Sequence, residues 1–136
     1  MNLPSVAIDN ITELLFKVIE FTQARQKLLI RNMNGIDRAD FVPKDLPVKE
    51  FTRALNTAID EHLLNKRLML QDTKNIKFGT SGSFTTEPII DWFAQKVLNK
   101  NCDEYIELQV NRLLENSLNQ RIAAELLKYK QSAVAF

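Results

Sequence analysis

The chain has 136 residues, of which 45% are hydrophobic, enough to bury the core of one ordinary domain and too many for a disordered chain. Its 18 basic residues nearly cancel its 17 acidic residues, which argues against binding to nucleic acid or an anionic membrane through bulk charge. One Cys and one His exclude an internal disulfide and a metal cage made of this chain's thiolates and imidazoles. We therefore expect no cofactor, no metal ion and no nucleic-acid partner.

The low content of helix-breaking residues, three Gly and four Pro, predicts a mostly helical protein. The first 16 residues contain no Lys or Arg, whereas a secretory signal begins with basic residues, so we expect no cleavable signal. No apolar stretch approaches the length of about 20 residues that spans a bilayer.

The first helix is predicted over residues 6–35, with Ser5 as its cap and a repeating apolar stripe. The heptad register of that stripe places Arg25 and Asn32 at apolar positions, where polar side chains can fix partner and register. The alternative, which we favour for Arg25, is a stem lying on the stripe edge with its charged head in water. Asn34-Gly35 then ends the helix, because both residues tolerate the left-handed conformation.

The middle of the chain is less regular. Residues 37–47 are predicted to be a loop, and a second helix starts near Pro47 and reaches as far as Leu70. Residues 71–88 fit either a mobile loop or a small hairpin built from residues 76–78 and 83–85. Residues 89–98 resume a helical pattern that breaks around residues 99–101, and we expect Trp92 to lie in the core.

The last helix is predicted over residues 103–135, and its apolar surface migrates around the helix. Such a helix is buried in a larger core or contacts several partners. The expected fold is all-α: long N- and C-terminal helices packed as a coiled-coil-like hairpin, with a shorter helix and an irregular or small β-hairpin middle segment. One domain would hold the N-terminal helix (1–36), the variable middle segment (37–100) and the C-terminal helix (101–136).

Catalytic motifs are absent from the sequence. It contains no Gly-rich phosphate loop, nucleophile elbow, paired-Cys metal spacing or metalloprotease motif. His62 adjoins Glu61, but nothing marks a nucleophile or a substrate pocket beside it, so we expect a solvated or edge residue. We therefore do not expect an enzyme.

Two segments resemble the bacterial flagellar axial proteins. Their first helix typically ends in a string like Asn-Ile-Ala-Asn-x-Asp-Thr-Pro-Gly-Tyr, and here the corresponding residues are Asn32-Met33-Asn34-Gly35-Ile36-Asp37-Arg38-Ala39-Asp40-Phe41. Arg25-Gln26 and Leu29 precede this string and Lys44-Asp45 follows it, whereas Arg38-Ala39-Asp40 replaces the family's turn. Near the other end, Glu115-Asn116-Ser117-Leu118 and Leu126-Leu127 are similar to the family's last helix. The short length favours the FlgB family of proximal rod proteins.

This resemblance implies a structural subunit that polymerises through its terminal helices into the periplasm-spanning rod of the flagellar basal body. It also implies export through the flagellar type III apparatus without a cleavable signal. The implied partners are other copies of the chain, other rod proteins, membrane-ring or rod adaptor proteins at the rod base, and the export apparatus. The residues that carry the resemblance, which would order the helix ends and contact neighbouring subunits, are Arg25, Gln26, Leu29, Asn32, Met33, Asp37, Phe41, Asn116, Ser117, Leu118, Leu126 and Leu127.

Two further interpretations stay open. Phe51 and Leu55 are similar to the hydrophobic signal by which rod and hook subunits engage the export gate, although two core residues one helical turn apart look the same, and we favour the core. The main alternative function is a soluble helical adaptor or export chaperone that binds a partner through an exposed apolar helix face. A small helical enzyme is a third possibility, but it would need a cluster of perturbed titratable groups, which the sequence does not offer.

Overall fold

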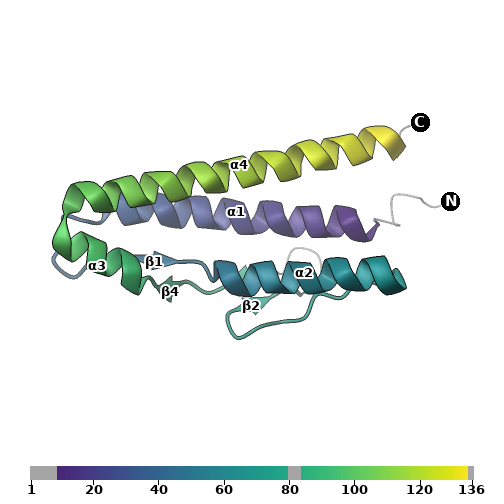
Figure 1. Cartoon of the computed structure of the whole chain (residues 1–136), viewed down its shortest axis with the longest axis horizontal. Helices are drawn as coiled ribbons and strands as arrows, with labels where there is room; N and C mark the ends of the chain where they lie inside the picture. Colours follow the sequence, from purple (N-terminus) through teal and green to yellow (C-terminus); the bar gives the residue numbers. More distant parts are fainter. Residues whose placement is uncertain (1–8, 80–83, 135–136) are drawn as a thin grey trace.

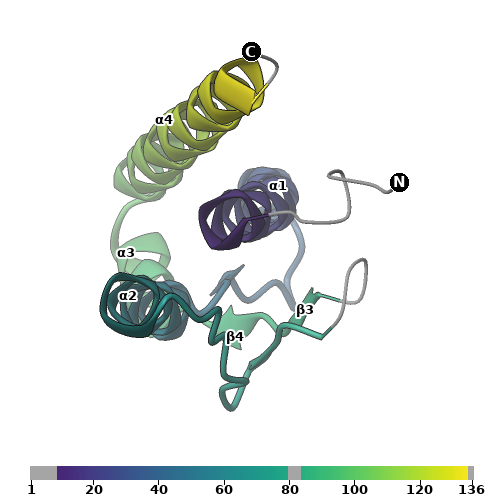
Figure 2. The same cartoon turned by 90° about the vertical axis from the view of Figure 1, so that its right-hand side faces the viewer.

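A computed structural model of the chain describes residues 9–79 and 84–134. It contains the helices α1 (Asn10–Asn34), α2 (Val48–Asn65), α3 (Trp92–Lys100) and α4 (Cys102–Val134). The two long helices, α1 and α4, lie side by side and run in opposite directions, while α2 lies along a different face of α1 (Figures 1 and 2). The expected mostly helical fold is confirmed.

Local signals fix both ends of α1. The side chain of Asp9 accepts a hydrogen bond from the Thr12 amide (2.7 Å), so the helix begins at Asn10 rather than near residue 6, and Ser5 lies outside the described residues. The helix ends at Asn34, as expected, but Gly35 has φ −89° and is not left-handed. Gly35 is needed for another reason: a Cβ there would overlap the ring of Phe41.

The second helix is shorter than expected. It begins at Val48 and ends at Asn65, short of Leu70. Lys66 adopts the left-handed conformation (φ 58°), and its amide donates to the His62 carbonyl oxygen (2.9 Å), which closes the helix. The left-handed cap therefore occurs at a lysine that no sequence signal marked.

Four two-residue strands form two antiparallel pairs. Of the two alternatives for residues 71–88, the hairpin is present, as β2 (Ile76–Lys77) paired with β3 (Thr85–Thr86). A second pair joins β1 (Lys44–Asp45) to β4 (Ile89–Ile90), which corrects the prediction that residues 89–98 are all helical. The helix starts later because Asp91 caps it, accepting a hydrogen bond from the Ala94 amide (3.0 Å). The predicted break is confirmed, since Asn101 is extended between α3 and α4.

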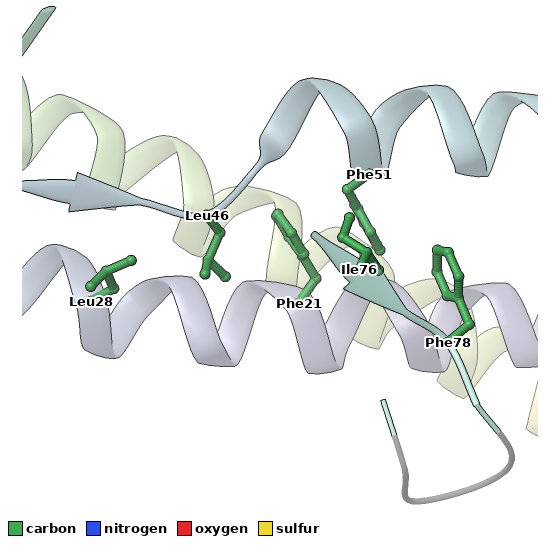
Figure 3. Close-up of a cluster of buried hydrophobic side chains, with 6 residues drawn as sticks. All are labelled: Phe21, Leu28, Leu46, Phe51, Ile76 and Phe78. Atoms are coloured by element: carbon green, nitrogen blue, oxygen red, sulfur yellow. The ribbon is translucent and has the colours of Figure 1, made fainter. Parts of the chain in front are cut away.

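The apolar core lies between α1, α2 and β2 (Figure 3). The rings of Phe21 and Phe51 stack at a centroid distance of 4.0 Å, and Phe78 packs beside Phe51. The full cluster is Phe21, Leu28, Leu46, Phe51, Ile76 and Phe78. This core joins the middle segment to α1, and α4 contributes no residue to it.

Trp92 does not belong to the core. It is 67% exposed, so the expectation of a core tryptophan is wrong. Trp92 is the first residue of α3, and the residue that this helix buries is Ala94. A small side chain therefore makes the close contact, and the large aromatic ring stays at the surface.

Candidate functional site

Arg25, on α1, is buried and ion-paired. Its Nε and Nη2 atoms donate to the two carboxylate oxygens of Asp45 at 2.8 Å each, and the residue is only 7% exposed. The prediction that its charged head reaches water is therefore wrong. The Asp45 carboxylate, on β1 and 20 residues later in the sequence, takes the place of the water that would solvate an exposed guanidinium.

A second ion pair adjoins the first. Arg112 on α4 pairs with Asp91, the cap of α3, and its Nη1 atom also lies 3.8 Å from the Asp45 carboxylate. The Asp91 amide donates to the Pro43 carbonyl oxygen (3.0 Å). The four charged side chains, which we call the charge cluster, are Arg25, Asp45, Asp91 and Arg112. Together they tie α1, β1, the start of α3 and α4 into one unit.

Asn32, near the end of α1, joins three segments. Its Nδ2 atom donates to the Lys44 carbonyl oxygen (2.7 Å) and to Gln109 Oε1 (3.2 Å), while its Oδ1 atom accepts from the Lys44 amide (3.2 Å). The Tyr105 hydroxyl donates to the Asn32 carbonyl oxygen (2.8 Å), and burial raises the pKa of Tyr105 to about 12. The phenol therefore stays protonated and keeps donating. Both side-chain polar atoms of Asn32 are thus hydrogen-bonded, whereas Gln109 Nε2 is buried without a hydrogen-bond partner. The bonds of Asn32 favour one alignment of the helices.

Asn116, further along α4, also joins α4 to α1 through a buried hydrogen bond. It is buried, and its Nδ2 atom donates to the Thr22 carbonyl oxygen of α1 (2.8 Å). The Thr22 hydroxyl donates to the Val18 carbonyl oxygen (2.8 Å). The hydrogen bond from Asn116 to the Thr22 carbonyl oxygen joins the two helices and fixes the position of α4 along α1.

The remaining residues of the family resemblance divide into three groups. Leu29 and Leu127 are buried, and Gln26, Met33 and Phe41 are half-buried. Asp37, Ser117, Leu118 and Leu126 are exposed. The buried residues therefore make contacts within the chain, whereas the exposed residues are accessible to another molecule.

Phe51 and Leu55 belong to the core region. Phe51 is 5% exposed and stacked on Phe21, whereas Leu55 is half-buried and packs against the same cluster. The core interpretation that we favoured for Phe51 is confirmed. His62 is half-buried at the end of α2, where its Nδ1 atom lies 3.1 Å from Asn10 Nδ2, which agrees with an edge residue.

The outer face of α4 carries six exposed large apolar side chains. We call this surface the outer row: Val110, Leu114, Leu118, Ile122, Leu126 and Tyr129, with exposures from 38% to 79%. The residues that α4 buries are Tyr105, Gln109, Asn116, Ala123 and Leu127. The outer row lies opposite the buried positions at Leu114 and Leu118 and winds toward them at Leu126. Helix α4 therefore buries two amides, Gln109 and Asn116, beside Tyr105, Ala123 and Leu127, and it leaves a row of large apolar side chains exposed, unlike an ordinary surface helix.

Sequence reasoning missed several polar partners in these contacts. Asp45, Asp91, Tyr105, Gln109 and Arg112 were not singled out as site residues. The spacing of Tyr105, Gln109, Arg112 and Asn116 is four, three and four, which is a heptad pattern that holds polar residues instead of aliphatic ones. A search for polar heptad positions would have found the three on α4 that face α1.

The described residues contain no helix long and apolar enough to cross a membrane. The same residues offer no group of three or more His, Cys, Asp or Glu side chains arranged to hold a metal ion. Comparison of the chain with models of protein families, with curated proteins and with solved structures finds no match in any of the three.

Proposed function

We propose that the chain is a structural subunit of the bacterial flagellar proximal rod, of the FlgB family, which polymerises through its terminal helices. The observation that carries this proposal is the exposed outer row of α4. Large apolar side chains in a continuous row on the outside of a helix favour burial against another protein. A subunit whose last helix is covered only in the assembly has this pattern.

The contacts between α1 and α4 support the same proposal. The buried residues of α4 recur at steps of four and seven, as in a coiled-coil-like pair with α1. Asn32 and Asn116, which carry the family resemblance, make the polar contacts that set this alignment. Polar residues at such positions specify a single register, which a subunit needs in order to repeat identically along a shaft.

The proposed setting defines partners and location. The subunit meets other copies of itself, other rod proteins and the membrane-ring or rod adaptor proteins at the rod base. It reaches the periplasm-spanning rod through the type III export apparatus. Because Phe51 is buried in the folded core, an export signal formed by Phe51 and Leu55 acts on the unfolded chain.

The decisive experiment is to purify intact basal bodies from cells that express the protein and to probe them for it. We expect the protein to co-purify with the basal body. Leu118→Asp, on the outer row, should lower its amount there and reduce swimming, whereas Thr57→Asp, an equal charge on the exposed surface of α2, should change neither. Basal bodies without the protein, together with a stable cytosolic monomer or small closed oligomer, would favour an adaptor or export chaperone instead.

A further inference from the structure

A hollow at the end of α1 has three cationic side chains in its wall. It has a volume of about 470 Å³ and is bounded by the last turns of α1, the chain that follows them, and strand β4. The three cations are Arg31, Arg38 and Lys44, and none of them forms an ion pair within the residues that the structure describes. Their charges are therefore available to a ligand.

Hydrogen bonds hold the backbone at the three cationic positions. The Arg31 carbonyl oxygen accepts from the Gly35 amide (2.9 Å), and the Arg38 amide donates to the Gly35 carbonyl oxygen (3.1 Å). The Asn32 side chain bonds to both the amide and the carbonyl oxygen of Lys44. A ligand in this hollow therefore has to order side chains but not a loop, which lowers the entropy lost on binding.

The charge balance of the hollow is positive. Two features oppose a bound anion: the Asp40 carboxylate, which also lines the hollow, and the negative end of the α1 dipole, which is equivalent to about half a charge. Three positive charges against these two terms leave an excess of about 1.5 charges. The hollow therefore favours a negatively charged ligand.

The remainder of the wall is mostly apolar and is formed by Leu28, Phe41, Val42 and Ile90. Val42 and Ile90 are 40% and 41% exposed. A small inorganic anion would contact the cations and leave this apolar surface in water. A peptide segment with carboxylates on both sides of an aliphatic side chain would use the cations and the apolar surface together.

We propose that this hollow is the docking site for an acidic segment of a partner protein. Carboxylates of the segment pair with Arg31, Arg38 and Lys44, and an aliphatic side chain between them packs on Val42 and Ile90. The site is complete within one chain and does not use the outer row of α4. It therefore does not depend on the proposed rod function.

The test follows the backbone amide resonances of the isotope-labelled full chain by NMR while a synthetic peptide is added. The probe is the acetylated and amidated peptide Asp-Glu-Leu-Glu-Asp, and its control is Asn-Gln-Leu-Gln-Asn, which has nearly the same shape and no charge. Inorganic phosphate is the third ligand. The variants are Arg38→Gln, Lys44→Gln and their combination, at exposed side chains, and Arg53→Gln on α2 removes the same charge elsewhere as a control. The spectrum of each variant also shows whether it is folded.

We expect the acidic peptide to shift amide resonances between residues 31 and 44 and at Ile90, to reach saturation, and to bind more weakly as added salt screens the charges. Arg38→Gln and Lys44→Gln should each weaken binding about threefold, because each removes one exposed ion pair with the peptide. The double variant should bind about tenfold more weakly than the wild type. Arg53→Gln should bind as the wild type does.

Four results would overturn the inference. They are the absence of saturable binding of the acidic peptide, equal binding of the uncharged peptide, unchanged affinity in the double variant, and phosphate that shifts the same resonances with an affinity as high as that of the acidic peptide. The last result would mean that the hollow binds small anions and not a protein segment. None of the four bears on the presence of the protein in basal bodies, so the two proposals fail separately.

Discussion

The charge cluster permits a sharp test of how the middle segment is held. Asp45 accepts two hydrogen bonds from Arg25 at 2.8 Å and one from the Leu46 amide at 2.7 Å. Asp45→Ala removes all three and leaves the guanidinium of Arg25 buried without its carboxylate. Removal of one partner from a buried ion pair costs about 3–5 kcal/mol, a large share of the roughly 5–15 kcal/mol that stabilises a whole domain.

The companion variants separate the lost charge from the lost packing. Asp45→Asn keeps an acceptor for Leu46 and should cost less than Asp45→Ala. Arg25→Met combined with Asp45→Leu replaces the pair by apolar groups of similar size and should cost less than either single loss of a partner. Urea unfolding followed by circular dichroism of the wild type, Arg25→Met, Asp45→Leu and the double variant gives the four free energies of a double-mutant cycle. A coupling energy below about 0.5 kcal/mol would refute the view that the pair acts as a unit.

Three other changes test separate parts of the fold. Gly35→Ala should lower the free energy of unfolding by about 1–3 kcal/mol because the new Cβ overlaps the Phe41 ring, and Phe41→Ala in the same background should reduce that loss. Phe51→Ala should cost about 3–5 kcal/mol in urea unfolding, whereas a loss below about 1 kcal/mol would contradict the stacked core. Glu50 accepts hydrogen bonds from Thr73 and Asn75, which lower its pKa, so its contribution to stability is present above about pH 4.3 and lost as the pH falls below it. Glu50→Gln should therefore be less stable than the wild type at pH 7, and thermal melts should show that difference narrowing below about pH 4; a constant difference would be incompatible with this account.

The helix content, the end of α1 and the break before α4 were predictable because they depend on local signals, whereas the start of α1, the end of α2 and the start of α3 were each misplaced by several residues. Asn34-Gly35 ended α1 as expected, and the hairpin formed from the two β-compatible pieces between residues 71 and 88. The migrating apolar surface of the last helix was also visible in the sequence, and it corresponds to the outer row. These features depend on residues that are close together along the chain.

Other errors come from contacts between residues that are far apart in the sequence. Arg25 was expected at the surface because its carboxylate, Asp45, lies in a segment without periodicity. Strands β1 and β4 have only two residues each, and α2 and the hairpin separate them in the sequence. Segments this short show no recognisable strand pattern. Trp92 was assigned to the core from its type alone, but a helix this short buries only its smallest side chain. Burial of a given residue depends on the tertiary neighbours that it meets.

The two long helices meet through more polar contacts than the middle segment makes, and this difference bears on why α4 has apolar surface to offer. The middle segment is fixed to α1 by aromatic and aliphatic packing, in a cluster to which none of the described α4 residues belongs. Helix α4 buries Ala123 and Leu127, and it adds directional polar contacts from Tyr105, Gln109, Arg112 and Asn116. Hydrogen bonds contribute only about 1 kcal/mol each to net stability, but they fix the height and rotation of a helix closely. A helix aligned in this way keeps the outer row exposed, where, in the assembly that we propose, these side chains stabilise contact with a neighbouring chain more than they stabilise the isolated fold.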